Sequence, residues 1–245
     1  MRPRPNRGES YLTVAVILWL CGCVLPAVSA TATAAQPKRA ADTMAERVRP
    51  CTSCHGKEGR ATSQGYLPRI AGKPARYLYN QLVNFREGRR HYALMSYLVD
   101  HLSDAYLYEM AGYFAALDVP YPPPQTASAS RAVITRGEAL VRQGDPARNV
   151  PACVECHGDN LMGAVAGVPG LLGLSVDYLQ AQLGQWRTGT RRAIAPDCMA
   201  KIATNLAPED ASAAAIWLAT QPVPQDALPR KSARELPMEC GGLAR

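Results

Sequence analysis

The sequence predicts an all-α protein built from two copies of one domain. Two observations carry this prediction: three blocks of sequence recur in the same order, and apolar residues within them are spaced three and four apart. No run of residues alternates between apolar and polar side chains over the length of a strand. A chain of 245 residues can hold two small domains, and an apolar fraction of 47% excludes wholesale disorder.

The internal repeat consists of three pairs of matching blocks. The motif Cys51-Thr-Ser-Cys54-His55-Gly56 recurs as Cys153-Val-Glu-Cys156-His157-Gly158, and residues 77–88 recur as residues 178–189. After a three-residue insertion, the third block of the first copy has four matches in the second: Met95 with Met199, Leu102 with Leu206, Tyr113 with Trp217, and Val119-Pro120 with Val223-Pro224. Such a pattern indicates duplication of a domain.

The repeat and the composition between its copies predict the domain boundaries. Residues 42–119 form the first domain and residues 132–224 the second. Residues 120–131 are rich in proline and small polar residues, which is typical of a semi-rigid linker. Residues 225–245 form a C-terminal extension.

Each copy is predicted to contain two amphipathic helices. In the first, the apolar residues fall on one face: Leu78, Leu82 and Phe85, repeated as Leu179, Leu183 and Trp186. In the second they follow the i, i+3, i+4, i+7 pattern: Leu107, Met110, Ala111 and Phe114, repeated as Ala211, Ala214, Ala215 and Leu218. This second helix is expected to have Ser103 as its N-cap in the first copy and Pro208 in its first turn in the second.

The N-terminus predicts a cleavable export signal over residues 1–30. Three arginines precede the apolar run 11–26, and small residues end at Ala30, where we expect cleavage. A permanent anchor is the alternative, but the apolar run is shorter than the roughly 20 residues that a membrane span needs. We do not expect lipid attachment at Cys23, because Cys21 is an unusual residue at its place in a lipobox.

The remaining chain is expected to reside in the periplasm, because no other stretch is apolar enough to span a bilayer. Cleavage removes three arginines and one glutamate from 27 basic and 20 acidic residues, which leaves a net charge of +5. This charge suits an acidic partner protein or peripheral association with an anionic membrane. We expect no nucleic-acid binding, since the basic residues are spread along the chain rather than clustered with aromatic residues.

The two Cys-x-x-Cys-His motifs predict two covalently bound haem c groups. In each motif the cysteines form thioether bonds to haem and the histidine ligates the iron: Cys51, Cys54 and His55, then Cys153, Cys156 and His157. A redox dithiol and a zinc knuckle are the alternatives. The first needs no adjoining histidine, and the second needs further ligands at comparable spacing.

Met95 and Met199 are the predicted sixth ligands of the two irons, because they occupy matching places 40 and 42 residues after the histidines. Met110 fits a helix core better. His91 and His101 flank Met95 as competing ligands, but neither has a counterpart in the second copy. Ligation by methionine and histidine raises the reduction potential and leaves no open position for a substrate.

These motifs resemble the diheme cytochrome c4 family of class I cytochromes c over about residues 42–224. The resemblance implies two tandem class I cytochrome c domains, each wrapped around its haem. It also implies an electron carrier between a quinol-oxidising complex and a terminal oxidase or another acceptor. The second copy departs from the family pattern, since Cys198 precedes Met199 and Ala207-Pro208 replaces the usual Ser-Asp.

Two further groups of residues are left with open alternatives. Cys198 and Cys240 form a disulfide, remain free thiols, or place Cys198 on the second iron as a thiolate. Four arginines that recur between the copies are candidates for binding the haem propionates or are solvated surface residues: Arg86, Arg90, Arg187 and Arg191.

Two other functions compete with the carrier. One is the cytochrome subunit of a larger oxidoreductase, such as a flavocytochrome c sulfide dehydrogenase. The other is an enzyme in its own right, such as a diheme peroxidase or a thiosulfate-oxidising cytochrome, which needs an open or labile position at one iron. The matched methionines argue against the enzyme.

Overall fold

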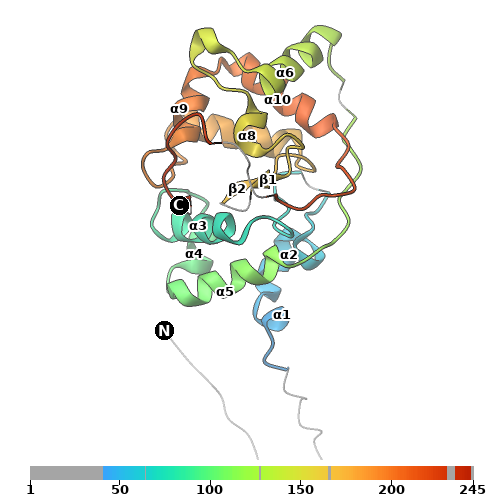
Figure 1. The fold of residues 1–245 in the computed structure, drawn as a ribbon. Helices are drawn as coiled ribbons and strands as arrows, with labels where there is room; N and C mark the ends of the chain where they lie inside the picture. The colour runs from blue at the N-terminus through green and yellow to red at the C-terminus, as the bar shows by residue number, and fades with distance from the viewer. Residues whose placement is uncertain (1–40, 64, 127, 165–166, 231–234, 244–245) are drawn as a thin grey trace, which may run out of the picture. The chain divides into compact units, whose positions relative to one another are not determined.

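The protein is helical, as the sequence predicts (Figure 1). The computed structural model describes residues 41–243 except 64, 127, 165–166 and 231–234, so the predicted export signal lies outside the described residues. The α-helices are α1 Met44–Arg47, α2 Arg49–His55, α3 Ala75–Arg86, α4 Ala93–Val99, α5 Asp104–Ala115, α6 Arg131–Gln143, α7 Cys153–His157, α8 Val176–Arg187, α9 Cys198–Asn205 and α10 Pro208–Thr220. Short 3₁₀ helices span Lys57–Gly59 and Pro146–Arg148. None of the helices in this part of the chain is long and apolar enough to cross a bilayer.

One small hairpin adds strand structure that the sequence did not predict. Strand β1, Gly163–Ala164, pairs antiparallel with β2, Val168–Pro169, and Gly163 lies opposite Pro169. Two-residue strands are too short to show an alternating pattern in the sequence.

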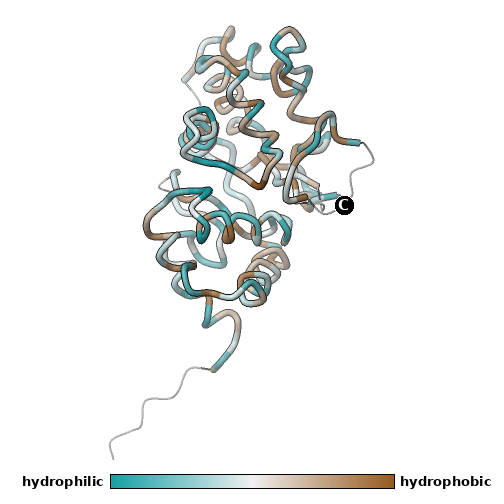
Figure 2. Tube along the Cα trace, turned by 90° about the vertical axis from the view of Figure 1, so that its left-hand side faces the viewer, coloured by the Kyte–Doolittle hydropathy of each residue, from teal (hydrophilic) through white to brown (hydrophobic). Residues whose placement is uncertain are grey.

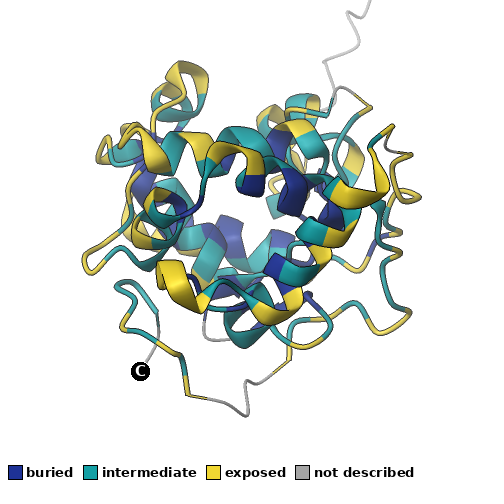
Figure 3. Ribbon diagram, turned by 90° about the horizontal axis from the view of Figure 1, so that it is seen from above, coloured by how far each residue is buried: buried dark blue, intermediate teal, exposed yellow. Residues whose placement is uncertain are grey.

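The predicted amphipathic helices are confirmed as α3, α5, α8 and α10. The Ser103 hydroxyl caps α5 by accepting a hydrogen bond from the Tyr106 amide, and α10 begins at Pro208. Hydropathy changes residue by residue along the helices (Figure 2), and the buried residues lie on their inward sides (Figure 3).

Among the described residues, most of the buried apolar side chains form two clusters. The first draws on residues between 48 and 114, and its most buried members include Val48, Leu107 and Ala111. The second draws on residues between 140 and 219, including Leu140 and Trp217. Each copy of the repeat therefore builds apolar packing of its own around its Cys-x-x-Cys-His helix, α2 or α7.

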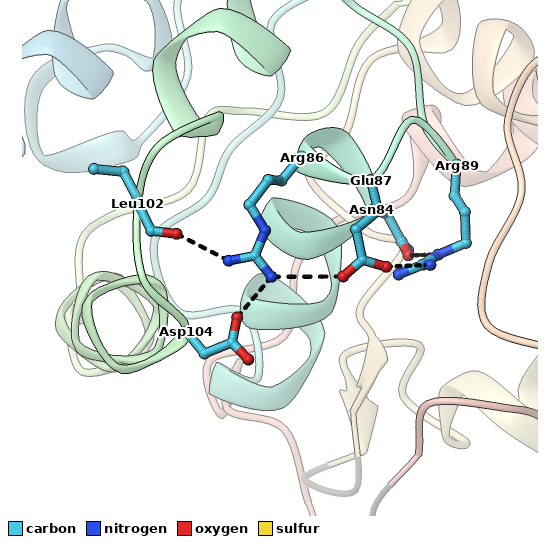
Figure 4. A network of polar contacts seen from close by, with 6 residues as sticks. All are labelled: Asn84, Arg86, Glu87, Arg89, Leu102 and Asp104. Carbon is cyan, nitrogen blue, oxygen red and sulfur yellow. Dashed lines mark hydrogen bonds and ion pairs between the residues drawn. The ribbon is translucent and has the colours of Figure 1, made fainter.

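Arg86 ties the end of α3 to the start of α5 (Figure 4). Its guanidinium donates to the Leu102 carbonyl oxygen at 2.9 Å and forms an ion pair with Asp104 at 2.6 Å. In the second copy Arg187 donates to the Leu206 carbonyl in the same way. These two arginines therefore hold helix ends together, which is a structural role.

In the second copy α6 and α10 lie side by side (Figure 1) and approach each other closely at Gly137. A Cβ atom there would lie 2.2 Å from the Ala213 carbonyl oxygen and 2.8 Å from the Cβ of Trp217. Because backbone is in the way on α10, a side chain at this position would force the helices apart.

Gly137→Ala is therefore expected to lower the free energy of unfolding by about 1–3 kcal/mol through overpacking. Gly184→Ala in α8 is the matched control, because a Cβ at that position meets nothing within 4 Å. The control should raise the free energy of unfolding by about 0.5–1 kcal/mol through helix propensity. Denaturant unfolding of both holoproteins measures the difference, and equal effects of the two substitutions would contradict the close helix crossing.

Candidate functional site

The two Cys-x-x-Cys-His motifs lie on matching helices, each of which ends at its histidine. Helix α2 stops at His55 because Gly56 adopts a φ of 77°, which L side chains rarely adopt. A Cβ at Gly56 would also lie 2.2 Å from the Ala61 carbonyl oxygen. The turn after the motif thus requires glycine, and it places the histidine at the end of a helix next to a loop.

Both histidine side chains are buried and oriented by a proline carbonyl. The Nδ1 atom of His55 donates to the Pro68 oxygen at 2.8 Å, and that of His157 to the Pro169 oxygen at 2.7 Å. Burial lowers the pKa of both imidazoles, which keeps them neutral. With Nδ1 engaged, Nε2 is the nitrogen left to ligate a metal.

The four motif cysteines are free of disulfides. Burial raises the pKa of the Cys153 thiol to about 12 and also raises the pKa of Cys51 and Cys156. A redox dithiol depends on a thiol with a lowered pKa, so these shifts argue against the redox-dithiol alternative.

One cavity of about 720 Å³ brings the predicted site residues together. Its lining includes the four motif cysteines, His55, His157, Met95 from α4 and Met199 from α9. Met110 packs in the first apolar cluster, as predicted. His91 also lines the cavity but is exposed, whereas His101 is exposed and does not line it, and its imidazole lies 3.4 Å from the Asp100 carboxylate.

Two arginines that line this cavity are buried and share their partners across the two copies. Arg90 is 8% exposed and Arg191 is 2% exposed. The side-chain oxygen of Gln182 accepts from Arg90 at 2.8 Å and from Arg191 at 2.5 Å. That of Gln81 accepts from Arg191 at 2.8 Å and from Arg90 at 3.2 Å. The alternative that Arg90 and Arg191 are solvated surface residues is therefore wrong.

Lys73 is another buried basic residue whose partner lies in the other copy. Lys73 donates from Nζ to the Gly170 carbonyl oxygen at 2.8 Å, and burial, together with Arg69, lowers its pKa to about 7. Among the described residues, the hydrogen-bond partners of Lys73, Arg90 and Arg191 are two side-chain amides, two phenols and a carbonyl. The buried guanidinium groups of Arg90 and Arg191 favour an anionic partner, and the carboxylates of a haem propionate fit this need.

The sequence indicates Arg90 and Arg191 only as candidates and gives no prediction for Gln81, Gln182 and Lys73. The sequence does contain a signal for the glutamines, since a glutamine recurs at the same place in α3 and α8. Lys73 has no such signal, because Leu174 stands at the matching position of the second copy.

The second methionine lies beside a disulfide. Cys198, the first residue of α9, pairs with Cys240, and their Cα atoms are 5.1 Å apart. Of the three alternatives that the sequence left open for these cysteines, the structure has the disulfide. Cys198 is therefore excluded as a thiolate ligand of the second iron.

Comparisons with known proteins identify the family. No protein-family model matches the chain. A thiosulfate dehydrogenase electron acceptor from Thiomonas intermedia (strain K12) is 35% identical over 176 residues, which cover 71% of this chain and 79% of the relative. A cytochrome c4 from Pseudomonas aeruginosa is 36% identical over 142 residues, which cover 58% of this chain and 68% of the relative. The chain belongs to the cytochrome c4 family.

Solved structures agree with this family. Reduced recombinant cytochrome c4 from Pseudomonas stutzeri matches with a TM-score of 0.63 and 29% identity, over 72% of this chain and 96% of that one. Thiosulfate dehydrogenase (TsdBA) from Marichromatium purpuratum matches with a TM-score of 0.63 and 34% identity. That match covers 71% of this chain, which spans 36% of the enzyme's chain.

Membership of the cytochrome c4 family establishes the fold, the cofactor and the role of the protein. It has the all-α class I cytochrome c fold, carries two covalently bound haem c groups and transfers electrons. Because the relatives are named as cytochromes c4 or electron acceptors, the carrier is favoured over the subunit of a flavocytochrome and over an enzyme.

The buried arginines of this cytochrome c4 homologue are expected to raise the haem potential, because a nearby positive charge favours ferrous over ferric iron. Arg191→Gln should lower the potential of at least one haem by tens of millivolts, where about 60 mV is tenfold in a one-electron equilibrium. Arg191→Lys keeps the charge and should shift the potential less. Spectroelectrochemical titration measures both, and unchanged potentials in Arg191→Gln would contradict this role.

Proposed function

We propose that the two halves of the chain hold one haem each, with matching sets of ligands. The residues of the first set are Cys51 and Cys54 for the thioether bonds and His55 and Met95 for the iron, and those of the second are Cys153, Cys156, His157 and Met199. One observation carries the proposal: all eight residues line the same cavity and occupy matching places in the repeat. Domain boundaries at residues 42–119 and 132–224 belong to the same proposal.

The residues around each haem suit electron transfer rather than catalysis. Each haem, when bound, supplies a one-electron iron couple. The proline carbonyls fix the histidine rings, and a thioether and an imidazole suit both oxidation states of iron, so little rearrangement accompanies transfer. Two axial ligands from the protein leave no position for a substrate.

The compartment and the partners are further parts of the proposal. A disulfide and the N-terminal export pattern both support an oxidising compartment, the periplasm. We infer that a thiosulfate-oxidising enzyme is an electron donor, since relatives are named as its electron acceptor. Terminal oxidases are the expected acceptors. Stopped-flow reduction by a thiosulfate dehydrogenase, compared with a quinol-oxidising complex, decides between the two donors.

Methionine substitution tests the ligand sets. Met95→Ala and Met199→Ala should each remove about half of the far-red methionine-to-iron band of the ferric protein, because each removes one of two thioether ligands. Met110→Leu is the control, since Met110 packs in the apolar cluster, and it should leave the band intact. A full band in either alanine variant would show that the corresponding methionine is not a ligand.

A further inference from the structure

The segment of residues 235–243, called here the C-terminal strap, crosses from the second half of the chain to the first. It passes beside α3 (Figure 1), where the side-chain amide of Asn80 donates to the Gly242 carbonyl oxygen at 2.6 Å. Arg76 donates to the same oxygen at 3.3 Å. Asn80 is only 9% exposed, so the strap covers a buried part of α3.

The C-terminal strap is also attached to the segment beside Met199. Cys240 forms the disulfide with Cys198, and the Gly241 amide donates to the Pro196 carbonyl oxygen at 2.8 Å. A Cβ at Gly241 would lie 2.1 Å from the Ile194 carbonyl oxygen, so the strap lies directly against the loop that precedes α9. Residues of the strap line the cavity together with Met199.

The two methionine loops differ in a way that gives the strap a role. Met95 follows Gly88 by seven residues, whereas Met199 follows Gly189 by ten, so the second loop has more freedom to lose on folding. At the position that matches Cys198, the first copy has Leu94, which is 47% exposed and not covered by a strap. The longer loop is therefore the one that carries a covalent tie.

We propose that the C-terminal strap is a positioning element of the second haem: it holds the start of α9 against α3 so that Met199 stays on the iron. The disulfide fixes the residue next to Met199, and the Asn80 contact fixes the strap to the first half. This inference rests on the proposed ligand sets. Met95 needs no equivalent, so the strap affects one haem only.

The test removes the Cys198–Cys240 disulfide from the holoprotein and measures the methionine-to-iron band and the two reduction potentials. In Cys198→Ser/Cys240→Ser the ferric far-red band should lose about half its intensity, and one potential should fall while the other is unchanged. In a Met95→Ala background, the same double substitution should remove the band that remains. Lys201→Ala is the control, since Lys201 is an exposed residue of α9, and it should change neither reading.

The outcomes separate this inference from the proposed function. If Met199→Ala removes half the band but the double cysteine variant keeps it whole, the strap has no positioning role and the ligand set stands. If Met199→Ala keeps the band, the ligand set is wrong and the strap inference fails with it. Should the double variant not accumulate as a folded holoprotein, Gly241→Val carries the same test, because it displaces the strap with the disulfide intact.

Discussion

The arrangement of the site depends on the hydrogen bond that fixes each buried histidine. Donation from Nδ1 to Pro68 or Pro169 determines which ring nitrogen is available and in which direction it lies. The glycine turn after each motif helix leads towards the loop that supplies this carbonyl. The same hydrogen bond, repeated at matching positions, explains why a duplicated domain can hold two similar redox centres.

The two copies of the domain differ in their surroundings. The contact between the halves is symmetric, since Arg90 and Arg191 share the partners Gln81 and Gln182. Lys73 and the disulfide, by contrast, have no counterpart in the other copy. Lys73 bonds to Gly170, next to the Pro169 carbonyl that orients His157, and the disulfide lies beside Met199. Two centres that share a fold thus differ in surroundings, which is how a protein gives similar haems different potentials.

Much of the fold could be predicted from the sequence because local patterns determine it. The helices α3, α5, α8 and α10 follow from apolar spacing, and the N-cap of α5 and the first turn of α10 follow from single residues, Ser103 and Pro208. The contact between the copies could not be predicted, because burial of Arg90 depends on residues about 90 positions away. The same limit applies to the strap, where Asn80 and Gly242 meet across 162 residues. The ligand roles of Met95 and Met199 remain a prediction from the repeat.

We propose that the chain carries electrons at two haems and that neither iron has an open position. Coulometric titration of the purified holoprotein, followed in the visible spectrum with a haem count, tests it most directly. We expect two electrons taken up per chain, two c-type haems, and low-spin spectra in both oxidation states. Uptake of one electron per chain, or a high-spin haem in the unmodified protein, would contradict it.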